Sequence, residues 1–343
     1  MFEVAPMRIR ELTKIIDCTP PVLSKKFKNE NEPAVLRKNN RISALSPELI
    51  ERYMTEKGHG YLYRSFITMI SSTVGGTGKT SGSLSLLAAA RRMTDRKHAI
   101  VLIDTDSQAS ATTTVLGQPI TDDKKVLVDL LEETCTLDDV LTPIGSPLEN
   151  IWVIGSNLNN VYLDKALTKP ADIRKSMRTV LGQILEKFGI GTKIFIDTPP
   201  QLSSVTSSTI CAMSDLKKSG TDCVMLMPIR SDLYSLKGAR ISMNEKKEVL
   251  NAFNLDDIPT SCFLASFDKR LKVSVEVMRM LLEDNLLKDH VSSVVVRSSS
   301  EFSKATVSYS NVFSSGDPNT AAADYMDLLL NLLGYEPNTK GNA

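Results

Sequence analysis

From residue 66 onward, short runs of apolar residues alternate with longer stretches in which apolar positions recur every three or four residues. Short continuous apolar runs are typical of strands buried in a parallel sheet, and the longer periodic stretches are typical of amphipathic helices. The alternation therefore predicts an α/β fold with a mostly parallel, doubly wound sheet. The predicted strands span residues 66–70, 99–103, 151–154, 193–196, 223–228, 261–265 and 293–296.

The first 64 residues follow a different pattern, with two short helical stretches separated by a turn. Residues 9–16 place apolar side chains at helical spacing, and Pro20 then suits the first turn of a second helix. Residues 22–28 continue that helix with a basic face, at the spacing of a helix-turn-helix. Because the second helix of such a motif can enter the major groove of DNA, the candidate contacts are Ser24, Lys25, Lys26 and Lys28.

A predicted hairpin follows, because two short runs at 34–37 and 41–44 flank an asparagine-rich turn at 38–40. Ser46 is then a good N-cap for a third helix, and Pro47 fits its first position. These features are typical of a winged helix-turn-helix. The predicted organisation is a small DNA-binding domain over residues 1–64, an α/β domain over 65–335 and a flexible tail over 336–343.

Composition and charge narrow the picture only a little. Apolar residues make up 42% and charged residues 24% of the 343 residues, which is ordinary for a globular protein of about two domains. The formal net charge is +1, so any affinity for nucleic acid must come from a local patch. The first 64 residues are such a patch, with 12 basic and 8 acidic residues.

The cysteines and the apolar runs exclude several classes of protein. The five cysteines form no C-x-x-C pair and match no zinc or iron–sulfur spacing, which favours reduced thiols in a reducing compartment. Residues 1–10 carry charges and no apolar run, unlike a signal peptide. No stretch reaches the roughly 18 apolar residues that a membrane span needs. We therefore expect a cytoplasmic protein without a membrane anchor.

A glycine-rich run after the first strand of the α/β part predicts a phosphate site. Glycines let successive backbone N–H groups curl around phosphate oxygens, and the helix that follows adds partial positive charge. Lys79 would reach the β- and γ-phosphates of a nucleotide, and the Thr80 hydroxyl would bind Mg²⁺. The common P-loop pattern has glycine at position 73, where this chain has Thr73. The predicted nucleotide-binding residues are Gly75, Gly76, Thr77, Gly78, Lys79, Thr80 and Ser81.

Two further apolar runs end in aspartates. Residues 101–103 lead into Asp104 and Asp106, and residues 194–196 lead into Asp197. An apolar strand that ends in aspartate beside a P-loop is the usual carboxylate on the Mg²⁺ side of a nucleotide site. One such aspartate could equally cap a helix, but this series of motifs in this order predicts an ATP site with Mg²⁺.

These motifs resemble those of the ParA/MinD group of P-loop ATPases, and within it the partition ATPases of the ParA type. The loop is similar to that group's [KR]-G-G-x-G-K-[ST], residues 104–108 to D-x-D-P-Q and residues 197–200 to D-x-P-P. Residues 224–228 resemble the strand that ends in proline in this group. The resemblance covers nearly the whole chain, and the N-terminal helix-turn-helix is like that of the larger plasmid ParA proteins.

The resemblance implies a role for each site residue. Lys79 would bind phosphates and act in catalysis, Asp106 would orient the attacking water, and Pro228 would contact the nucleotide. The Mg²⁺ residues that it implies are Thr80, Asp104 and Asp197, the two carboxylates through water.

The resemblance also implies partners. Proteins of this type form a sandwich dimer on ATP, bind DNA nonspecifically in that state on the nucleoid, and respond to a centromere-binding ParB-like partner. The N-terminal domain would bind an operator and repress the protein's own operon. A basic cluster, Lys269, Arg270 and Lys272, together with Arg297 and Lys304, is either a solvated face or the nonspecific DNA surface.

One position departs from the group. The signature lysine that reaches the partner's nucleotide should stand at position 74, where this chain has Val74. This favours, as an alternative, a DNA-binding regulator whose P-loop binds nucleotide but hydrolyses it weakly, although the intact Asp106 argues for hydrolysis. A MinD-like division-site ATPase is disfavoured, because residues 324–333 carry acids and no lysine or arginine where a basic membrane helix would be needed.

Overall fold

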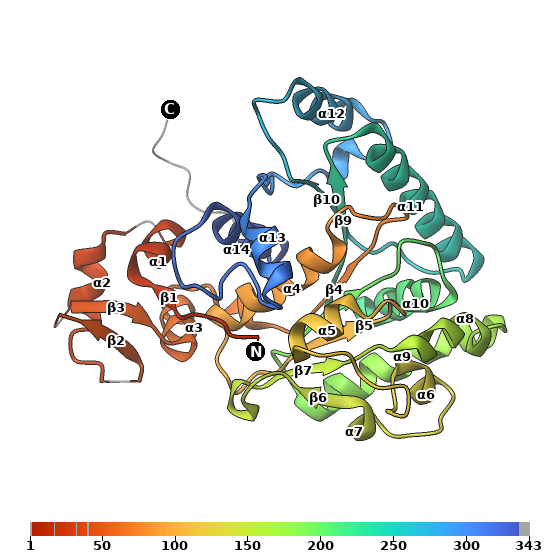
Figure 1. Ribbon diagram of the computed structural model, residues 1–343, viewed down its shortest axis with the longest axis horizontal. Coiled ribbons are helices and arrows are strands. Elements are labelled where there is room, and N and C mark those ends of the chain that lie inside the picture. The colour runs from red at the N-terminus through yellow and green to blue at the C-terminus, as the bar shows by residue number, and fades with distance from the viewer. Residues whose placement is uncertain (1, 17, 32, 40, 336–343) are drawn as a thin grey trace.

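The computed structural model describes residues 2–16, 18–31, 33–39 and 41–335 of the chain. A small N-terminal part lies to one side of a larger α/β part, and the C-terminal helices lie between them (Figure 1). The predicted tail over 336–343 lies outside the described residues.

A seven-stranded sheet forms the centre of the larger part, in the order β10-β9-β4-β8-β5-β7-β6. Its neighbouring strands pair in parallel, apart from β6 and β7, which pair antiparallel. The predicted α/β fold with a mostly parallel sheet is therefore confirmed. The strands are β4 (Phe66–Ile70), β5 (Ile100–Asp104), β6 (Leu141–Pro143), β7 (Ile151–Ile154), β8 (Lys193–Asp197), β9 (Asp222–Arg230) and β10 (Thr260–Ala265).

Two strand predictions differ from the structure. Residues 293–296 form no strand, and this prediction is wrong: isolated bridges flank the run at Val291 and Arg297, and the Val296 N–H donates to the Leu264 oxygen at 2.8 Å without a continuous ladder. Conversely, the edge strand β6 was not predicted, because it has only three residues and ends in Pro143. Proline is tolerated at a sheet edge because no ladder hydrogen bond is needed from its nitrogen.

Side chains of the central strands alternate between two apolar layers. Ile67 and Met69 of β4 belong to one buried cluster, whereas Ile70 belongs to the other. Helices α9 to α12 pack in the first layer, and α4, α5 and α14 in the second, so the sheet is covered on both faces. The helices of this part are α4 (Lys79–Met93), α5 (Ser110–Leu116), α6 (Leu127–Leu131), α7 (Leu137–Val140), α8 (Leu163–Ala166), α9 (Pro170–Phe188), α10 (Ser204–Lys218), α11 (Leu233–Ala252), α12 (Lys272–Glu283), α13 (Glu301–Val307) and α14 (Thr320–Leu332), with short 3-10 turns at Pro147–Glu149, Leu158–Tyr162 and Lys288–His290.

The N-terminal part contains the helices and the hairpin at the positions that the sequence predicts. The strand that opens it, β1, was not predicted and completes a small antiparallel sheet in the order β1-β3-β2. Ser46 caps α3 as expected, its Oγ accepting a hydrogen bond from the Leu49 N–H at 3.4 Å. The elements are β1 (Met7–Arg8), α1 (Ile9–Ile15), α2 (Pro20–Lys26), β2 (Val35–Lys38), β3 (Arg41–Leu45), α3 (Pro47–Glu56) and a 3-10 turn at Gly60–Tyr63.

The two parts share one apolar core. Leu12, Leu23 and Leu45 are buried in the same cluster as the apolar faces of α4 and α14. Near the end of α4, Arg92 is almost completely buried and donates hydrogen bonds to the backbone oxygens of Ala5 and Pro6 at 2.8 and 3.0 Å. Buried contacts thus cross the domain boundary predicted after residue 64, which stays a prediction. Within the described residues, no helix is long and apolar enough to cross a membrane.

Candidate nucleotide-binding site

The loop between β4 and α4 carries the predicted phosphate-binding residues. Gly76 and Gly78 have φ angles of 69° and 98°, in the left-handed region that residues with a Cβ rarely adopt. Gly78 is the N-cap of α4, so the amino end of a 15-residue helix faces the loop. Gly75 is exposed and Thr77 is buried in the same loop. This is the backbone geometry that a phosphate group needs.

The Lys79 side chain lies back along the loop. It is 8% exposed, and its Nζ donates hydrogen bonds to the backbone oxygens of Ser72 and Val74, both at 3.1 Å. Burial lowers the pKa of the Lys79 ammonium, and the carboxylates of Asp197 and Asp106 counteract that shift. The amine is therefore held beside the loop by neutral carbonyls, which phosphate oxygens can replace.

Asp197 ends β8 directly beside the loop. Its Oδ2 accepts a hydrogen bond from the Thr80 Oγ1 at 2.8 Å, and its Oδ1 accepts one from the Ser83 Oγ at 2.9 Å. Burial and then the charge of Asp104 raise the pKa of this carboxyl. Ser83 was not predicted, because its contact depends on α4 passing β8 and no motif marks it.

Asp104 ends the neighbouring strand, where it stands in register with Asp197. Its carboxylate accepts hydrogen bonds from the Thr112 N–H and Oγ1 at 2.9 and 2.7 Å and from the Asp106 N–H at 3.1 Å. Burial raises the pKa of Asp104 in spite of these bonds. Asp106 is only half-buried, and its Oδ1 accepts from the Gln108 N–H at 2.9 Å. The structure thus brings the three predicted aspartates together at the carboxyl ends of the central strands, beside the loop.

The side-chain oxygens at these strand ends are suitable ligands for the Mg²⁺ ion of a bound nucleotide. Thr80 and Asp197 offer hydroxyl and carboxylate oxygens, the ligand type that Mg²⁺ prefers. Among the described residues, no cluster of three or more acidic, histidine or cysteine side chains could hold a metal by itself. Mg²⁺ usually keeps waters and takes phosphate oxygens as further ligands, so a sparse protein contribution is what such a site needs.

The outer side of the loop packs against α11 (Leu233–Ala252). Thr73 donates hydrogen bonds from its N–H to the Ser242 Oγ at 3.2 Å and from its Oγ1 to the Gly238 oxygen at 3.1 Å. Val74 lies against Gly238 so closely that a Cβ on that glycine would meet its Cγ2 at 2.3 Å. Arg230, at the end of β9, donates from Nη1 to the Gly76 oxygen at 3.4 Å. No sequence motif marks these contacts, because they join segments more than 150 residues apart.

The other predicted contacts of the α/β part come from β9 and from the segment after β10. Pro228 is buried in β9, in register with Phe263 of β10, and its nucleotide contact stays a prediction. Lys269, Arg270 and Lys272 lie between β10 and the start of α12, and all are exposed. Most of the cations that we grouped as a DNA surface have acidic partners: Arg270 pairs with Asp268, Arg297 with Asp324 and Lys304 with Glu301.

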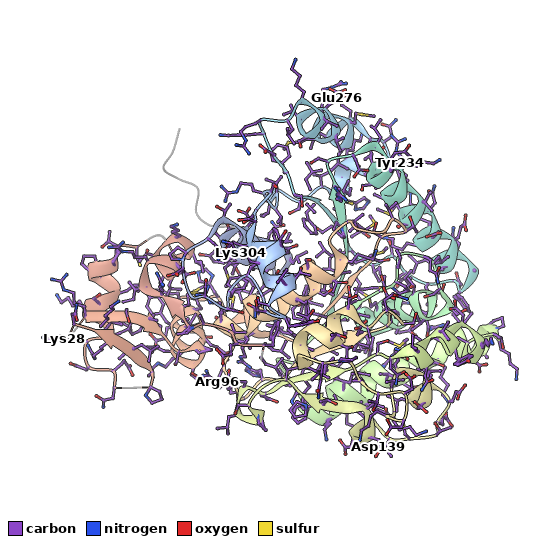
Figure 2. All side chains as sticks on the ribbon, viewed as in Figure 1. Lys28, Arg96, Asp139, Tyr234, Glu276 and Lys304 are labelled. Carbon is purple, nitrogen blue, oxygen red and sulfur yellow. The ribbon has the colours of Figure 1, made fainter. Side chains whose placement is uncertain are left out.

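The second helix was predicted to reach residue 28, but α2 ends at Lys26, so Lys28 lies in the turn after it. The predicted DNA contacts in and after α2 face in different directions. Lys26 forms an ion pair with Glu56 at 3.0 Å and lies over the ring of Tyr53 at 5.9 Å from its centroid. Ser24 and Lys28 instead line a cleft on the other side of the helix, which is lined by six basic residues and no acidic one. Lys28 lies at the outer end of the N-terminal part, far from the C-terminal helices (Figure 2). Lys25 is exposed on α2.

A sequence model of the family described as AAA domain matches residues 65–258, which is more than half of the chain. The chain belongs to this family. The match begins just before β4 and includes the loop and the three aspartates.

Individual relatives agree with this assignment. The chain is 27% identical over 263 residues to the cell division protein PomZ of Myxococcus xanthus, covering 76% of this chain and 75% of PomZ. Its fold is similar to the Cyanothece McdA–ATP complex, with a TM-score of 0.63 at 16% identity over 80% of this chain and 99% of McdA. A plasmid partition protein of Borrelia burgdorferi bound to AMPPNP gives a TM-score of 0.60 at 15% identity, over 78% of this chain and 98% of that one.

A third structure supports the cofactor prediction. Cobyrinic acid a,c-diamide synthase of Mycobacterium smegmatis, with a bound ATP analogue and magnesium, gives a TM-score of 0.61 at 15% identity, over 78% of this chain and 94% of the synthase. ATP and Mg²⁺ are thus the ligands found in structures of this fold. The resemblance to ParA-type ATPases is confirmed by the family match together with these relatives.

Proposed function

We propose that this protein is a Mg²⁺-dependent ATPase that partitions or positions DNA, as ParA-type proteins do. The observation that carries the proposal is the hydrogen bond from Thr80 to Asp197 at 2.8 Å. It lies beside a glycine loop whose lysine, Lys79, is buried against the loop backbone. The similarity to PomZ, a cell division protein, and to a plasmid partition protein supports a role in positioning.

Each residue has a separate task in this proposal. The loop N–H groups and Lys79 bind the phosphates, and Thr80 and Asp197 hold Mg²⁺, which neutralises charge that develops during phosphoryl transfer. Thr112 fixes the Asp104 carboxylate through two hydrogen bonds. In this proposal Asp104 contacts Mg²⁺ through a bridging water. Asp106 is half-buried just after the end of β5, where a carboxylate can orient an attacking water.

The partners follow from the same resemblance. We propose that ATP binding favours a homodimer, that the dimer binds DNA nonspecifically on the nucleoid, and that a centromere-binding ParB-like partner stimulates hydrolysis. The cluster Lys269, Arg270 and Lys272 stays a proposed nonspecific surface, in which Lys269 and Lys272 have no ion pair among the described residues. The alternative, a DNA-binding regulator that hydrolyses ATP weakly, is favoured by Val74.

Phosphate release separates these two functions. The protein is assayed with ATP and Mg²⁺ alone, with DNA, and with DNA plus the protein encoded directly downstream of its gene. A partition ATPase is stimulated by the combination. A regulator shows the same slow release in all three assays while it still binds ATP.

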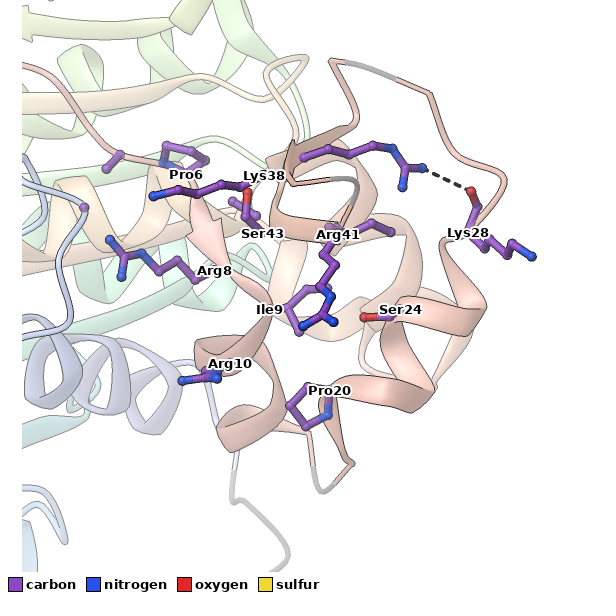
Figure 3. Close-up of a pocket in the computed structure, with 15 residues that line it drawn as sticks. Pro6, Arg8, Ile9, Arg10, Pro20, Ser24, Lys28, Lys38, Arg41 and Ser43 are labelled. Carbon is purple, nitrogen blue, oxygen red and sulfur yellow. Dashed lines mark hydrogen bonds between the residues drawn. The ribbon is translucent and has the colours of Figure 1, made fainter.

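A second proposed function is specific DNA binding by the N-terminal helix-turn-helix. A cleft of about 870 Å³ lies between α2, β1 and the hairpin, and none of the fifteen residues that line it is acidic. Ser24 points across this cleft toward Arg41, whereas Lys28 points outward (Figure 3). The six basic residues of the lining, which we call the basic cleft, are Arg8, Arg10, Lys28, Arg37, Lys38 and Arg41.

This concentration of charge favours a polyanion as the ligand. DNA binding that neutralises phosphates falls with salt, with a slope of roughly −0.9 per phosphate on a double-logarithmic plot. Footprinting of the region upstream of the gene tests the proposal. Protection that persists when the cationic cleft residues are replaced by glutamine would place the DNA elsewhere.

A further inference from the structure

Position 74 supplies no charge to the phosphate loop. Val74 packs its side chain against Gly238 of α11, and its backbone oxygen accepts a hydrogen bond from Lys79. The lysine that ParA-type loops have here, and that reaches the partner's nucleotide, is absent from this chain. The loop of this chain therefore has only one cation of its own for a nucleotide whose terminal phosphate carries much of the negative charge.

Another cation reaches the loop from β9. Arg230 is the last residue of that strand, which lies directly beside β4 in the sheet. Its Nη1 lies 3.4 Å from the Gly76 oxygen and would be 3.6 Å from a Cβ on Gly76. The guanidinium therefore touches the exposed tip of the loop at Gly76.

The Arg230 guanidinium keeps most of its donors available. The carboxylate nearest to it, that of Asp232, is 3.8 Å from Nε, which is too far for a hydrogen bond. Asp232 is already engaged as the N-cap of α11, accepting from the Ser235 N–H at 2.8 Å and from its Oγ at 3.1 Å. By contrast, Arg270 and Arg297 are held in close ion pairs. The Arg230 side chain is 53% exposed, so water now solvates the donors that a phosphate could use.

We propose that Arg230 contacts the terminal phosphate of the nucleotide bound in its own loop, and so adds a second cation to a loop in which Lys79 is the only one. This inference rests on the proposed ATP site. Arginine remains charged and presents a planar fork of donors that matches phosphate oxygens in a bidentate geometry. The hydrogen bond to Gly76 holds the guanidinium at the loop before nucleotide binds. The contact would make the site prefer ATP over ADP.

The test compares the affinities of two nucleotides in one variant. Arg230→Gln keeps a donor for the Gly76 oxygen but removes the charge. Dissociation constants for mant-ATP and mant-ADP are measured with Mg²⁺ by fluorescence, at protein concentrations where the chain is monomeric. We expect about tenfold to hundredfold weaker mant-ATP binding, the effect of one hydrogen bond between charged groups, and unchanged mant-ADP binding. Arg230→Lys should recover part of the loss.

Arg52→Gln is the matched control. Arg52 has nearly the same side-chain exposure, 54%, but lies on α3 of the N-terminal part and pairs with Glu30. It should change neither dissociation constant.

Each other result overturns the assignment in a distinguishable way. Equal weakening of both nucleotides means that Arg230 only shapes the loop, and no weakening of either means that it does not reach the phosphate. A wild-type chain that binds neither nucleotide refutes the ATP site itself, and the role of Arg230 with it.

Discussion

The nucleotide site and the basic cleft are both proposed to bind phosphate groups, yet their charges are arranged in opposite ways. At the nucleotide site Lys79, Asp104 and Asp197 are buried, and each is hydrogen-bonded before any ligand arrives. In the basic cleft six cations line one opening with no acidic residue among them. The first site is a closed network of paired groups. In the second, Arg8 pairs with Asp317 at 2.9 Å, and the other five cations have no ion pair among the described residues.

Burial explains the difference. A charge removed from water is costly unless hydrogen bonds and opposite charges compensate, so buried polar groups must be paired within the protein. Exposed cations are solvated and need no partner, but salt screens them. We therefore expect single substitutions to have large and specific effects at the nucleotide site, and small, salt-dependent and additive effects in the basic cleft.

The largest expected effect is at Lys79. Lys79→Ala should abolish ATP binding, because it removes the buried cation beside the loop. Asp106→Ala should keep ATP binding and lose hydrolysis, because that carboxylate is placed to orient water and does not hold phosphate. Fluorescent nucleotide titration and phosphate release measure the two properties, and circular dichroism checks that both variants fold. Equal loss of affinity in both variants would contradict these roles.

A second prediction concerns the connection between the two regions. Glu11 of α1 accepts two hydrogen bonds from the buried Arg92 of α4, at 2.8 and 2.9 Å. Glu11→Gln should lower the free energy of unfolding by about 3 kcal/mol, because a buried cation loses its counter-charge. Glu56→Gln, which breaks an exposed pair with Lys26, should cost about 0–1 kcal/mol. Denaturant unfolding of both variants provides the comparison, and similar values would show that the two parts are not held by this buried pair.

The third prediction tests the network around Mg²⁺. Thr80→Ala removes the hydroxyl that donates to Asp197 and is proposed to bind the metal. The Mg²⁺ concentration needed for half-maximal ATP hydrolysis should rise roughly tenfold or more, the usual effect of losing a group that holds or orients a metal ligand. Thr80→Ser keeps the hydroxyl and should behave as wild type. An unchanged Mg²⁺ requirement in Thr80→Ala would remove Thr80 from the metal site.

The smallest effects are expected in the basic cleft. Lys28→Ala and Arg41→Ala should each lower the salt slope of DNA binding by about 1, because each removes one phosphate contact. Lys26→Ala should leave the slope unchanged, since Lys26 faces Glu56 and Tyr53 on the opposite side of α2. Fluorescence anisotropy over a range of salt concentrations measures the slopes. A larger effect from Lys26 than from Lys28 would show that DNA approaches the other face.

Local sequence signals determined the position of the proposed nucleotide site, the hairpin and the cap of α3. The run of glycines before Lys79 and the aspartates after two apolar runs predicted the nucleotide site, because loop conformation and strand ends depend on neighbours in the chain. The same holds for the hairpin and for the Ser46 cap. The run at 293–296 was misjudged because strand formation also depends on pairing with a distant segment. Its residues suit a strand, but the isolated bridges at Val291 and Arg297 lie outside it.

Only the tertiary structure decided which distant side chains meet. Ser83 and Thr112 orient the buried carboxylates because α4 and α5 cross the strand ends, and no spacing in the chain predicts either contact. Arg230 reaches the tip of the loop because β9 lies beside β4. The basic cleft likewise gathers cations from β1, α1, the turn after α2 and the hairpin, whose charges in the sequence are mixed with acidic residues. Periodicity decides which face of an element is buried, whereas the packing of elements against one another decides what that face meets.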